Sequence, residues 1–473
     1  MFYRLLLFFC YFHLVVVSWT PDSWRQKPRT KFIQRYHDNK ELKKTEQALL
    51  KSSPIVNGFE CQDLQKKIAL ASQGKAFVLM GGDCAETFED FSPNYIRDMY
   101  RLLLQMGIFL SYSTGIPTIK ISRMAGQFAK PRSEDYEKIQ NGNNIDFVES
   151  YKGDIINGFS QKQRKPNPKR MLQAYHHSIQ TINFLRSFSF GGYASVHNIE
   201  HWKLEKSFLI KTNAYYKKIK DALRFMKGLD LNVDNPIFTQ TKLFTGHEAL
   251  LLQYEESLTR KDSFLKKYFG CSGHFLWVGE RTRDLDSPHI EYLRGIHNPI
   301  GIKLSEKCKD NELVELIQRL NPDNDYGRIT LITRFGKENI EKHLPRFIKT
   351  IKDNHLNVLW CCDPVHGNTK KLENGVKTRY FNDIWTELKL FFEIHYQHHS
   401  IPGGVHLEMT PLSVTECIDS ENVFLENIKD NYKTKCDPRL NAKQSLDLIC
   451  NLCDFILKNN LKNENMKENS VQN

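Results

Sequence analysis

The sequence predicts an α/β protein built around a closed (β/α)8 barrel with a parallel sheet. Eight short apolar runs of strand length follow one another along the chain, and each ends in polar or glycine-containing punctuation. Amphipathic helical stretches such as “NELVELIQRL” and “NIEKHLPRFIKTI” separate most of these runs. At 473 residues and 40% hydrophobic, the chain is long enough for one such barrel with additions.

The predicted strands can be assigned in chain order. They lie in “KAFVLMGGDCAE”, “IPTIKISRMAGQ”, “TQTKLFTGHEA”, “HFLWVGERTR”, “PIGIKLSEK”, “GRITLITRFG”, “NVLWCCDPVHG” and “GGVHLEMT”. Most are apolar at the centre and turn polar at their ends, which is typical of buried parallel strands; the third is the weakest. Their alternation with helical stretches predicts the barrel.

The barrel is expected to carry additions. Residues 19–75 precede the first strand and are helical in part, so they form an N-terminal extension. The interval 122–240 is too long for one crossover, and it is predicted to contain an inserted helical pair, at about 201–232, between the second and third strands. The barrel domain is therefore predicted at 76–456, followed by a polar, disordered tail at 457–473.

Residues 1–18, “MFYRLLLFFCYFHLVVVS”, are predicted to be a signal-like hydrophobic leader outside the fold. Their apolar run, from Leu5 to Val17, is shorter than the ~20 residues that span a bilayer. Its length and one early arginine are typical of a signal peptide. No other stretch is apolar enough to cross a membrane, so we expect no span in the mature protein.

The net charge limits the kinds of ligand that the protein can be expected to bind. Lysine and arginine outnumber acids 67 to 55, which is compatible with nucleic acid, an anionic membrane or small anionic substrates. The cations are scattered, so most are expected on a solvated surface.

The eleven cysteines have no regular disulfide spacing, which favours a reducing compartment. The single CxxC, at Cys450 and Cys453, lies in an apolar helical pattern and predicts core packing.

Chemically active side chains follow the predicted strands, and in such barrels the carboxyl ends of the strands carry the chemistry. In chain order they are Asp83, Cys84, Glu86, Arg123, Lys130, Arg132, His247, Glu248, Glu280, Arg281, Lys303, Arg334, Asp363, His366, His406 and Glu408. If the strands are assigned correctly, these groups converge on one rim of the barrel.

Two subsets point to different chemistry. Four cations follow the second, fourth, fifth and sixth predicted strands and predict a site for a multiply charged anion such as a phosphate or carboxylate, although each alone could be a surface ion pair: Arg123, Arg281, Lys303 and Arg334. A second set of sulfur, nitrogen and oxygen donors suits a divalent transition metal: Cys84, His366, Glu408 and Asp437. A histidine in a turn and a cysteine beside a glycine pair are also common structural residues, so spacing leaves the metal site open.

Longer motifs resemble a known family. They are “WTPDSWRQKP”, “GGDCAETF”, “RMAGQFAKPRS”, “GDIING”, “HEALLLQYEESLTR”, “LWVGERTRDLD”, “LRGIHNPIGIK”, “LNPDNDYGRITLITRFG”, “DPVHGNT”, “KTRYF”, “PGGVHLEMT”, “VTEC” and “CDPRLNAKQSLDL”. In this order, from Trp19 to about Leu448, they resemble the class II (plant and microbial type) 3-deoxy-D-arabino-heptulosonate 7-phosphate (DAHP) synthases.

The resemblance implies a set of roles. It implies one divalent metal (Mn, Co, Zn or Fe) on Cys84, His366, Glu408 and Asp437. It implies phosphoenolpyruvate at Arg123, Glu280, Arg281, Lys303 and Arg334, and the phosphate of erythrose 4-phosphate at Lys130, Arg132, Ser133 and Lys377. Lys303, Glu280 and Glu248 are the expected catalytic groups. The expected protein is a homo-oligomer, a dimer or tetramer, in the cytoplasm or a plastid-type organelle.

Some residues depart from the family pattern. His297 in “IHNPIG” and Lys152 in “YKGD” stand where the family usually has arginine, and “MTPLSVTEC” lacks the commoner glycine. None is an expected metal ligand. Two other functions are compatible with parts of the sequence. A catalytically silent regulatory or scaffold homologue is disfavoured by the complete set of site residues. A nucleic-acid-binding protein is disfavoured by the expected position of the cations at the barrel rim.

Overall fold

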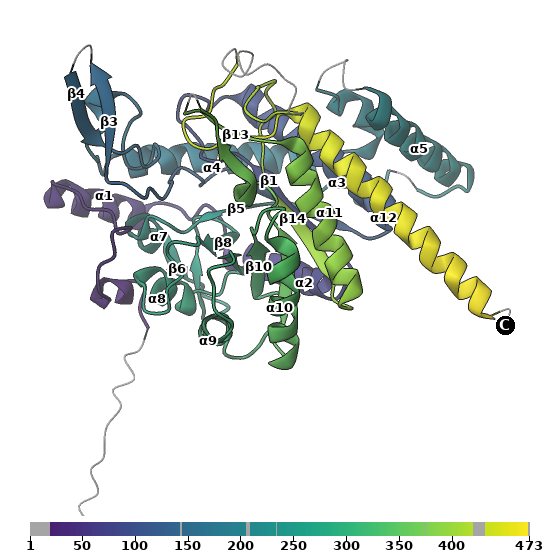
Figure 1. The fold of residues 1–473 in the computed structure, drawn as a ribbon. Helices are drawn as coiled ribbons and strands as arrows, with labels where there is room; N and C mark the ends of the chain where they lie inside the picture. Colours follow the sequence, from purple (N-terminus) through teal and green to yellow (C-terminus); the bar gives the residue numbers. More distant parts are fainter. Residues whose placement is uncertain are drawn as a thin grey trace, which may run out of the picture.

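The computed structural model describes residues 19–471 except 142–143, 205–208, 233, 374 and 420–430, so the predicted leader lies outside the described residues. Eight parallel strands close a barrel in the order β1–β14–β11–β10–β9–β8–β5–β2 (Figure 1). Their bounds are β1 Phe77–Gly82, β2 Thr118–Arg123, β5 Leu243–Glu248, β8 Phe275–Val278, β9 Ile300–Leu304, β10 Ile329–Thr333, β11 Val358–Cys362 and β14 Pro402–Glu408. Each strand falls on one of the eight predicted runs, with β14 starting one residue before its run, which confirms the predicted barrel.

The register of the strands aligns their carboxyl ends. Gly82, the last residue of β1, lies opposite Arg123 of β2 on one side and Glu408 of β14 on the other. The next residues after β1 are Asp83 and Cys84, so three of the predicted strand ends meet at one level of the rim.

The inside of the barrel is filled by apolar side chains. Met80, Ile121, Trp277 and Ile332 belong to one buried cluster that continues into Ile68 of α2 (Gly58–Ser72). Helix α2 therefore closes the amino end of the barrel. Since the interior is packed, access to the strand ends is left at the carboxyl end.

The helices outside the barrel bury apolar side chains in the core around the strands, and the C-terminal helix packs mainly against the helix that follows β1. They are α3 Pro93–Thr114, α7 Leu252–Ser257, α8 Pro288–Gly295, α9 Asp310–Leu320, α10 Ile340–Asp353, α11 Phe381–Gln397 and α12 Ala442–Val471. Helix α3 is an example of how the sequence sets where a helix begins and ends. At its start the Ser92 side chain accepts a hydrogen bond from Tyr95 N at 3.2 Å, and Pro93 is the first helical residue. At its end Gly115 adopts a left-handed conformation, with φ 70°. Within the described ranges, no helix combines the length and the apolar character needed to span a bilayer.

The N-terminal extension and the insertion lie on the outside of the barrel. The extension holds η1 Ser23–Gln26, α1 Asn39–Lys51 and α2. The insertion holds β3 Tyr136–Asn141, β4 Asn144–Glu149, η2 Gln161–Gln163, α4 Arg170–Phe190, η3 Val196–Trp202, α5 Leu209–Gly228 and α6 Pro236–Thr239. Figure 1 shows the β3–β4 hairpin on one side of the molecule and α5 with α12 on the other. Where a helical pair was expected at about 201–232, the described residues contain the end of η3 and the single α-helix α5, while 205–208 lie outside them.

Two other features were not predicted from the sequence. One short hairpin comes after β5 and pairs β6 Thr259–Lys261 with β7 Tyr268–Gly270. Another comes after the 3-10 turn η4 His366–Asn368 and pairs β12 Thr369–Lys371 with β13 Lys377–Arg379. The tail predicted to be disordered at 457–473 is helical as far as Val471, since α12 continues through it. The helix starts in a buried segment that contains Cys450 and Cys453, which confirms their expected core role.

Candidate active site

A cavity of about 220 Å³ opens at the carboxyl ends of the barrel strands. It gathers predicted site residues from most strand ends: Arg123, Lys130, Glu248, Glu280, Arg281, Lys303, Arg334, His366, Lys377 and Asp437. The predicted strand-end residues therefore meet, as the barrel requires.

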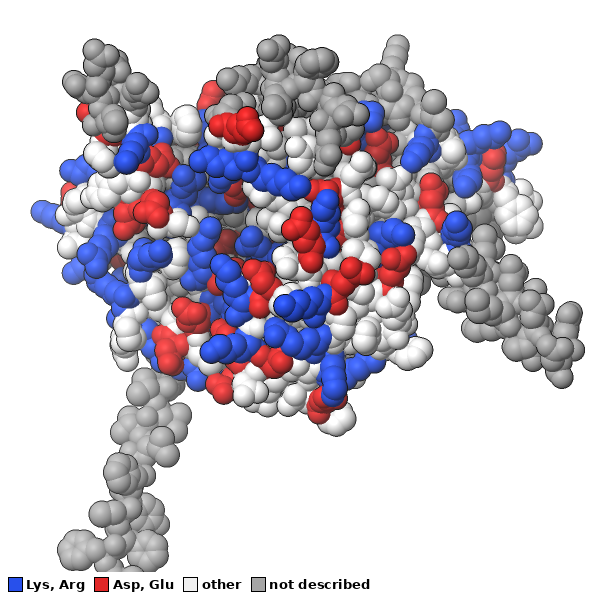
Figure 2. Space-filling view, viewed as in Figure 1, with Lys and Arg blue, Asp and Glu red and all other residues white. Residues whose placement is uncertain are grey.

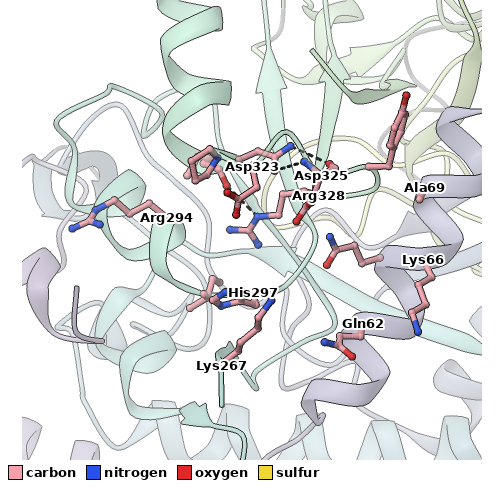
Figure 3. A pocket seen from close by; sticks show the side chains of 15 residues that line it. Gln62, Lys66, Ala69, Lys267, Arg294, His297, Asp323, Asp325 and Arg328 are labelled. Atoms are coloured by element: carbon pink, nitrogen blue, oxygen red, sulfur yellow. Dashed lines mark hydrogen bonds between the residues drawn. The ribbon is translucent and has the colours of Figure 1, made fainter. Parts of the chain in front are cut away.

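A larger cavity, of about 420 Å³, lies at the opposite end of the barrel, between α2 and the segments that precede β9 and β10 (Figure 3). It contains Arg328 and His297, and Figure 3 shows Lys267 extending toward His297. None of the predicted catalytic, substrate or metal residues lines it. His297, one of the departures from the family pattern, thus lies away from the candidate active site.

The four predicted cations differ in their partners. Arg123 donates to the carbonyls of Asp83 at 2.8 Å and Cys84 at 3.1 Å, which fixes it against the loop after β1. Arg281 donates only to the Pro131 carbonyl, at 3.2 Å, and Arg334 Nε has no hydrogen-bond partner among the described residues. Arg281 and Arg334 therefore keep donors available for an anionic ligand.

Asp363 joins Lys303 to His366. Its Oδ2 accepts a hydrogen bond from Lys303 Nζ and lies 2.7 Å from His366 Nδ1. Burial opposes ionisation of Asp363, but His366 and Lys303 outweigh it and hold the pKa of this carboxyl well below its usual range. Burial, with Arg123 nearby, lowers the pKa of Lys303 despite Asp363. Asp363 therefore orients the imidazole and leaves Nε2 facing Glu408, 3.0 Å away.

Three of the four predicted metal ligands lie around the Lys130 ammonium group, and the fourth, His366, contacts one of them, Glu408. Lys130 Nζ is 2.8 Å from Cys84 Sγ, 2.9 Å from Asp437 Oδ2 and 3.4 Å from Glu408 Oε1. In the part of the chain that the structure describes, no three His, Cys, Asp or Glu side chains are already arranged as a metal site. The structure thus brings Cys84, Glu408 and Asp437 together around the positive charge of Lys130, and His366 joins them through Glu408.

The protonation of these groups suits a cation at their centre. Burial disfavours the charged carboxylate of Glu408, but His366 and Lys130 hold its pKa well below the usual range. Lys130 likewise lowers the pKa of Asp437 against the effect of burial. Burial lowers the pKa of His366 although Asp363 and Glu408 oppose this, and it raises the pKa of the Cys84 thiol, which would have to give up its proton to bind a metal.

The residues expected for the second phosphate are divided. Lys377 lines the cavity, and its Nζ is 2.8 Å from Asp437 Oδ1. Arg132 instead pairs with Glu137 of β3 at 2.6 Å, and Ser133 is exposed; neither lines this cavity. Lys130, as shown above, contacts the predicted metal ligands.

Two carboxylates complete the cavity wall. Glu280 is tied down, since its oxygens accept from Arg283 Nη2 and from Ser305 N, both at 2.9 Å. Glu248 Oε1 has no hydrogen-bond partner among the described residues, and burial raises its pKa although Lys130 and other cations oppose this. A Cβ at Gly279 would lie 2.2 Å from Glu248 Oε1, so a larger residue there would displace this carboxylate.

A sequence profile of the Class-II DAHP synthetase family matches residues 19–453. The chain belongs to this family. A Neurospora crassa protein named phospho-2-dehydro-3-deoxyheptonate aldolase is 40% identical over 458 residues, which cover 92% of this chain and 94% of that protein. Proteins of the same name are similar in Streptomyces coelicolor, at 39% identity over 90% of this chain and 95% of that protein, and, as AroG, in Mycolicibacterium smegmatis, at 38% identity over 90% and 92%.

One residue that contacts the predicted metal ligands in this class-II DAHP synthetase was missed. Arg379, at the end of β13, is fully buried, with Nη2 2.9 Å from Glu408 Oε2 and Nε donating to Thr369 Oγ1 at 2.9 Å. It lies two residues after Lys377 in “KTRYF”, and the alternation of side chains along a strand could have indicated it.

Two carboxylates that fix loops at the rim, the half-buried Glu86 and the buried Glu387, had no predicted role. Glu86 accepts from the backbone N–H groups of Ala125, Gly126 and Gln127 at 2.8–3.0 Å, which fixes the loop after β2. Glu387, within α11, accepts from Phe335 N at 3.0 Å, Gly336 N at 2.9 Å and Asn368 Nδ2 at 2.7 Å. Glu387 therefore ties the turn after Arg334 to the turn that carries His366.

Proposed function

We infer that this chain is a DAHP synthase. It condenses phosphoenolpyruvate with D-erythrose 4-phosphate and water, and it releases DAHP and phosphate. Membership of the class-II DAHP synthetase family over residues 19–453 carries this conclusion. A strand-end cavity that gathers cations for two phosphorylated substrates supports it. The reaction opens the shikimate pathway to chorismate and the aromatic amino acids.

We propose that the cations around the cavity position phosphoenolpyruvate. Arg281 and Arg334, which have no carboxylate partner among the described residues, are suited to its anionic groups, and Arg123, Lys303 and Glu280 complete that side of the cavity. Lys377 and Lys130 face the second substrate and are suited to its phosphate. Holding both substrates in one small cavity turns a bimolecular encounter into a positioned reaction.

We propose that Cys84, His366, Glu408 and Asp437 hold one divalent metal, of which Mn, Co, Zn and Fe fit the mixed donor set. When bound there, the metal would act as a Lewis acid on the aldehyde of erythrose 4-phosphate. The fit is supported by ionised Glu408 and Asp437, by a His366 whose Nδ1 is held by Asp363, and by the Lys130 cation among these ligands.

The bond changes of the reaction define what the side chains must do. C3 of phosphoenolpyruvate forms a bond with the aldehyde carbon, C2 becomes electron-poor, water adds at C2, and phosphate leaves. We propose that Lys303 and Glu248 manage the proton of the attacking water. Burial shifts the pKa of Lys303 downward and that of Glu248 upward, so each approaches the range in which a group can exchange protons near neutral pH.

The test is phosphate release by protein reconstituted with each metal in turn. We expect release only when both substrates are present. Release from phosphoenolpyruvate alone, or none with any metal, would contradict the proposed reaction. A silent homologue would still bind phosphoenolpyruvate without turnover, so a binding measurement on the same samples separates the two outcomes.

We propose an oligomeric enzyme, a dimer or tetramer, in the cytoplasm or a plastid-type organelle. All ten cysteines that the structure describes are free, which supports a reducing compartment. Light scattering after size exclusion tests the assembly. Cell fractionation with N-terminal sequencing of the native protein tests the location, and an extracellular, disulfide-linked form would contradict it.

A further inference from the structure

A separate cavity of about 420 Å³ lies in the N-terminal extension, and none of the candidate active-site residues lines it. Its walls come from the segment around η1, from α1, and from Gln253 and Pro288 at the starts of α7 and α8. The extension is not part of the barrel, so the reaction itself does not explain this cavity.

The cavity is strongly cationic. Its lining includes one acid, Glu46, and five cations: Arg25, Lys27, Arg29, Arg35 and Lys43. Arg25 pairs with Glu46 at 2.8 Å and with Glu256 at 2.7 Å, whereas none of the other four has an ion pair within the described ranges. Figure 2 shows Lys and Arg side chains gathered where Figure 1 places α1 and the preceding segment. Unpaired cations around one cavity are suited to a multivalent anion.

Two buried polar groups in the wall lack partners. Tyr36 is 7% exposed and Gln253 is 4% exposed, and neither Tyr36 Oη nor Gln253 Oε1 has a hydrogen-bond partner among the described residues. Burial raises the pKa of Tyr36, so its hydroxyl stays a donor. An unpaired buried donor and acceptor are costly. A ligand with anionic oxygens could accept from Tyr36, and a ligand hydroxyl could donate to Gln253.

The wall of this cavity reaches toward the active-site loop. Gln253 Nε2 donates to the Gln34 carbonyl at 2.8 Å, and Lys31 Nζ donates to the Ser133 carbonyl at 3.3 Å. Gln34 also lines a small cavity together with Lys130, a residue of the catalytic cavity. The segment 31–36 therefore lies between the extension cavity and the loop that carries Lys130.

We propose that the extension cavity is a second binding site, for a small multivalent anion that also carries a hydroxyl group. Its ligand is either an organic phosphate or a hydroxylated polycarboxylate. A bound ligand contacts the segment 31–36 and so supports the loop at Lys130 from outside the active site. This inference concerns the extension alone and does not depend on the reaction at the strand ends.

The test uses the metal-loaded full chain saturated with phosphoenolpyruvate, titrated calorimetrically with 3-phosphoglycerate and, separately, with citrate. At least one probe should show binding that the double variant Arg29→Gln/Lys43→Gln weakens about 10-fold or more. The matched control is Lys44→Gln, which changes an exposed lysine next to Lys43 that does not line the cavity. Lys377→Gln, in the catalytic cavity, should leave this binding unchanged.

Tyr36→Phe separates a ligand contact from a structural role. It removes a hydroxyl that has no partner among the described residues, so the melting temperature without probe should not fall, while probe binding should weaken. The proposal is overturned if neither probe binds the saturated protein. It is equally overturned if Lys44→Gln weakens binding as much as the double variant, or if Lys377→Gln abolishes it. The probe that binds identifies the phosphate or the carboxylate class.

Discussion

Replacing Arg281 with alanine tests the anion-binding role of the strand-end cavity most directly. Arg281 donates one hydrogen bond, to the Pro131 carbonyl at 3.2 Å, and its side chain is exposed. Its removal leaves no carboxylate without a partner, so the free energy of unfolding should hardly change. Lys303 would be a poorer choice, because its loss would leave the buried Asp363 carboxylate without its lysine partner.

The expected loss falls on phosphoenolpyruvate binding. A charge-assisted hydrogen bond contributes about 1.5–3 kcal/mol, which corresponds to an affinity about 10- to 150-fold weaker. Calorimetric titration measures the affinity, and steady-state phosphate release gives KM and kcat. Arg224→Ala, at an exposed position of α5 outside the cavity, is the matched control. If Arg281→Ala kept the affinity, KM and kcat of the unaltered protein, Arg281 would not bind the substrate.

Three other predictions follow from buried charges and donors. Lys303→Ala should destabilise the protein by about 3–5 kcal/mol in urea unfolding, because Asp363 loses a buried partner; a smaller change than that of Arg281→Ala would contradict this. Chelation should abolish phosphate release, and adding Mn, Co or Zn should restore it to different extents. The Cys84→Ser variant should retain metal more weakly. Full turnover by metal-stripped protein would refute the metal site. Burial raises the pKa of Glu387 to about 8 from 4.5, so the folded protein keeps a proton that the unfolded chain has lost. The stabilisation that comes from this proton is fully present below about pH 4.5 and is lost as the pH rises through about 8. Over this range the free energy of unfolding of the unaltered protein should therefore fall relative to that of Glu387→Gln. If the two proteins gave parallel profiles of unfolding free energy against pH in urea, Glu387 would not titrate there.

The strands were predictable because each is a nearly continuous apolar run ended by polar residues or glycine. The meeting of the site residues at one rim was predictable from the strands, because a closed parallel barrel places the carboxyl ends of all strands at one level. Cys84, Arg123 and Glu408 all lie at such ends or just after them. Asp437 follows no predicted strand; it was included as a fourth donor further along the chain, and the family resemblance then implied its role as a ligand. The β3–β4 hairpin gave no comparable signal, because its aromatic residues Tyr136 and Phe147 are exposed and its pattern is largely polar.

The missed residues depend on contacts that sequence spacing does not show. Glu387 stands in the helical stretch “DIWTELKLFF”, where a single carboxylate is typical of a solvated face, yet it is fully buried and accepts hydrogen bonds from two loops. Lys130 was expected at a substrate phosphate, but its contact with Cys84 arises because the loop fixed by Glu86 turns back toward β1.

The pairing of β1 with β14 also has a consequence for how the protein is made. Val78 lies opposite Gly404, and Asp437 comes later still in the chain. Asp83, just after β1, is held by two hydrogen bonds from Arg439, at 3.0 and 3.1 Å. A ribosome that has released the first seven strands therefore exposes an open sheet with unpaired edges and only part of the donor set. Contacts between such distant parts of a chain form slowly, so the nascent chain must be kept from aggregating until its last segment emerges and closes the ring.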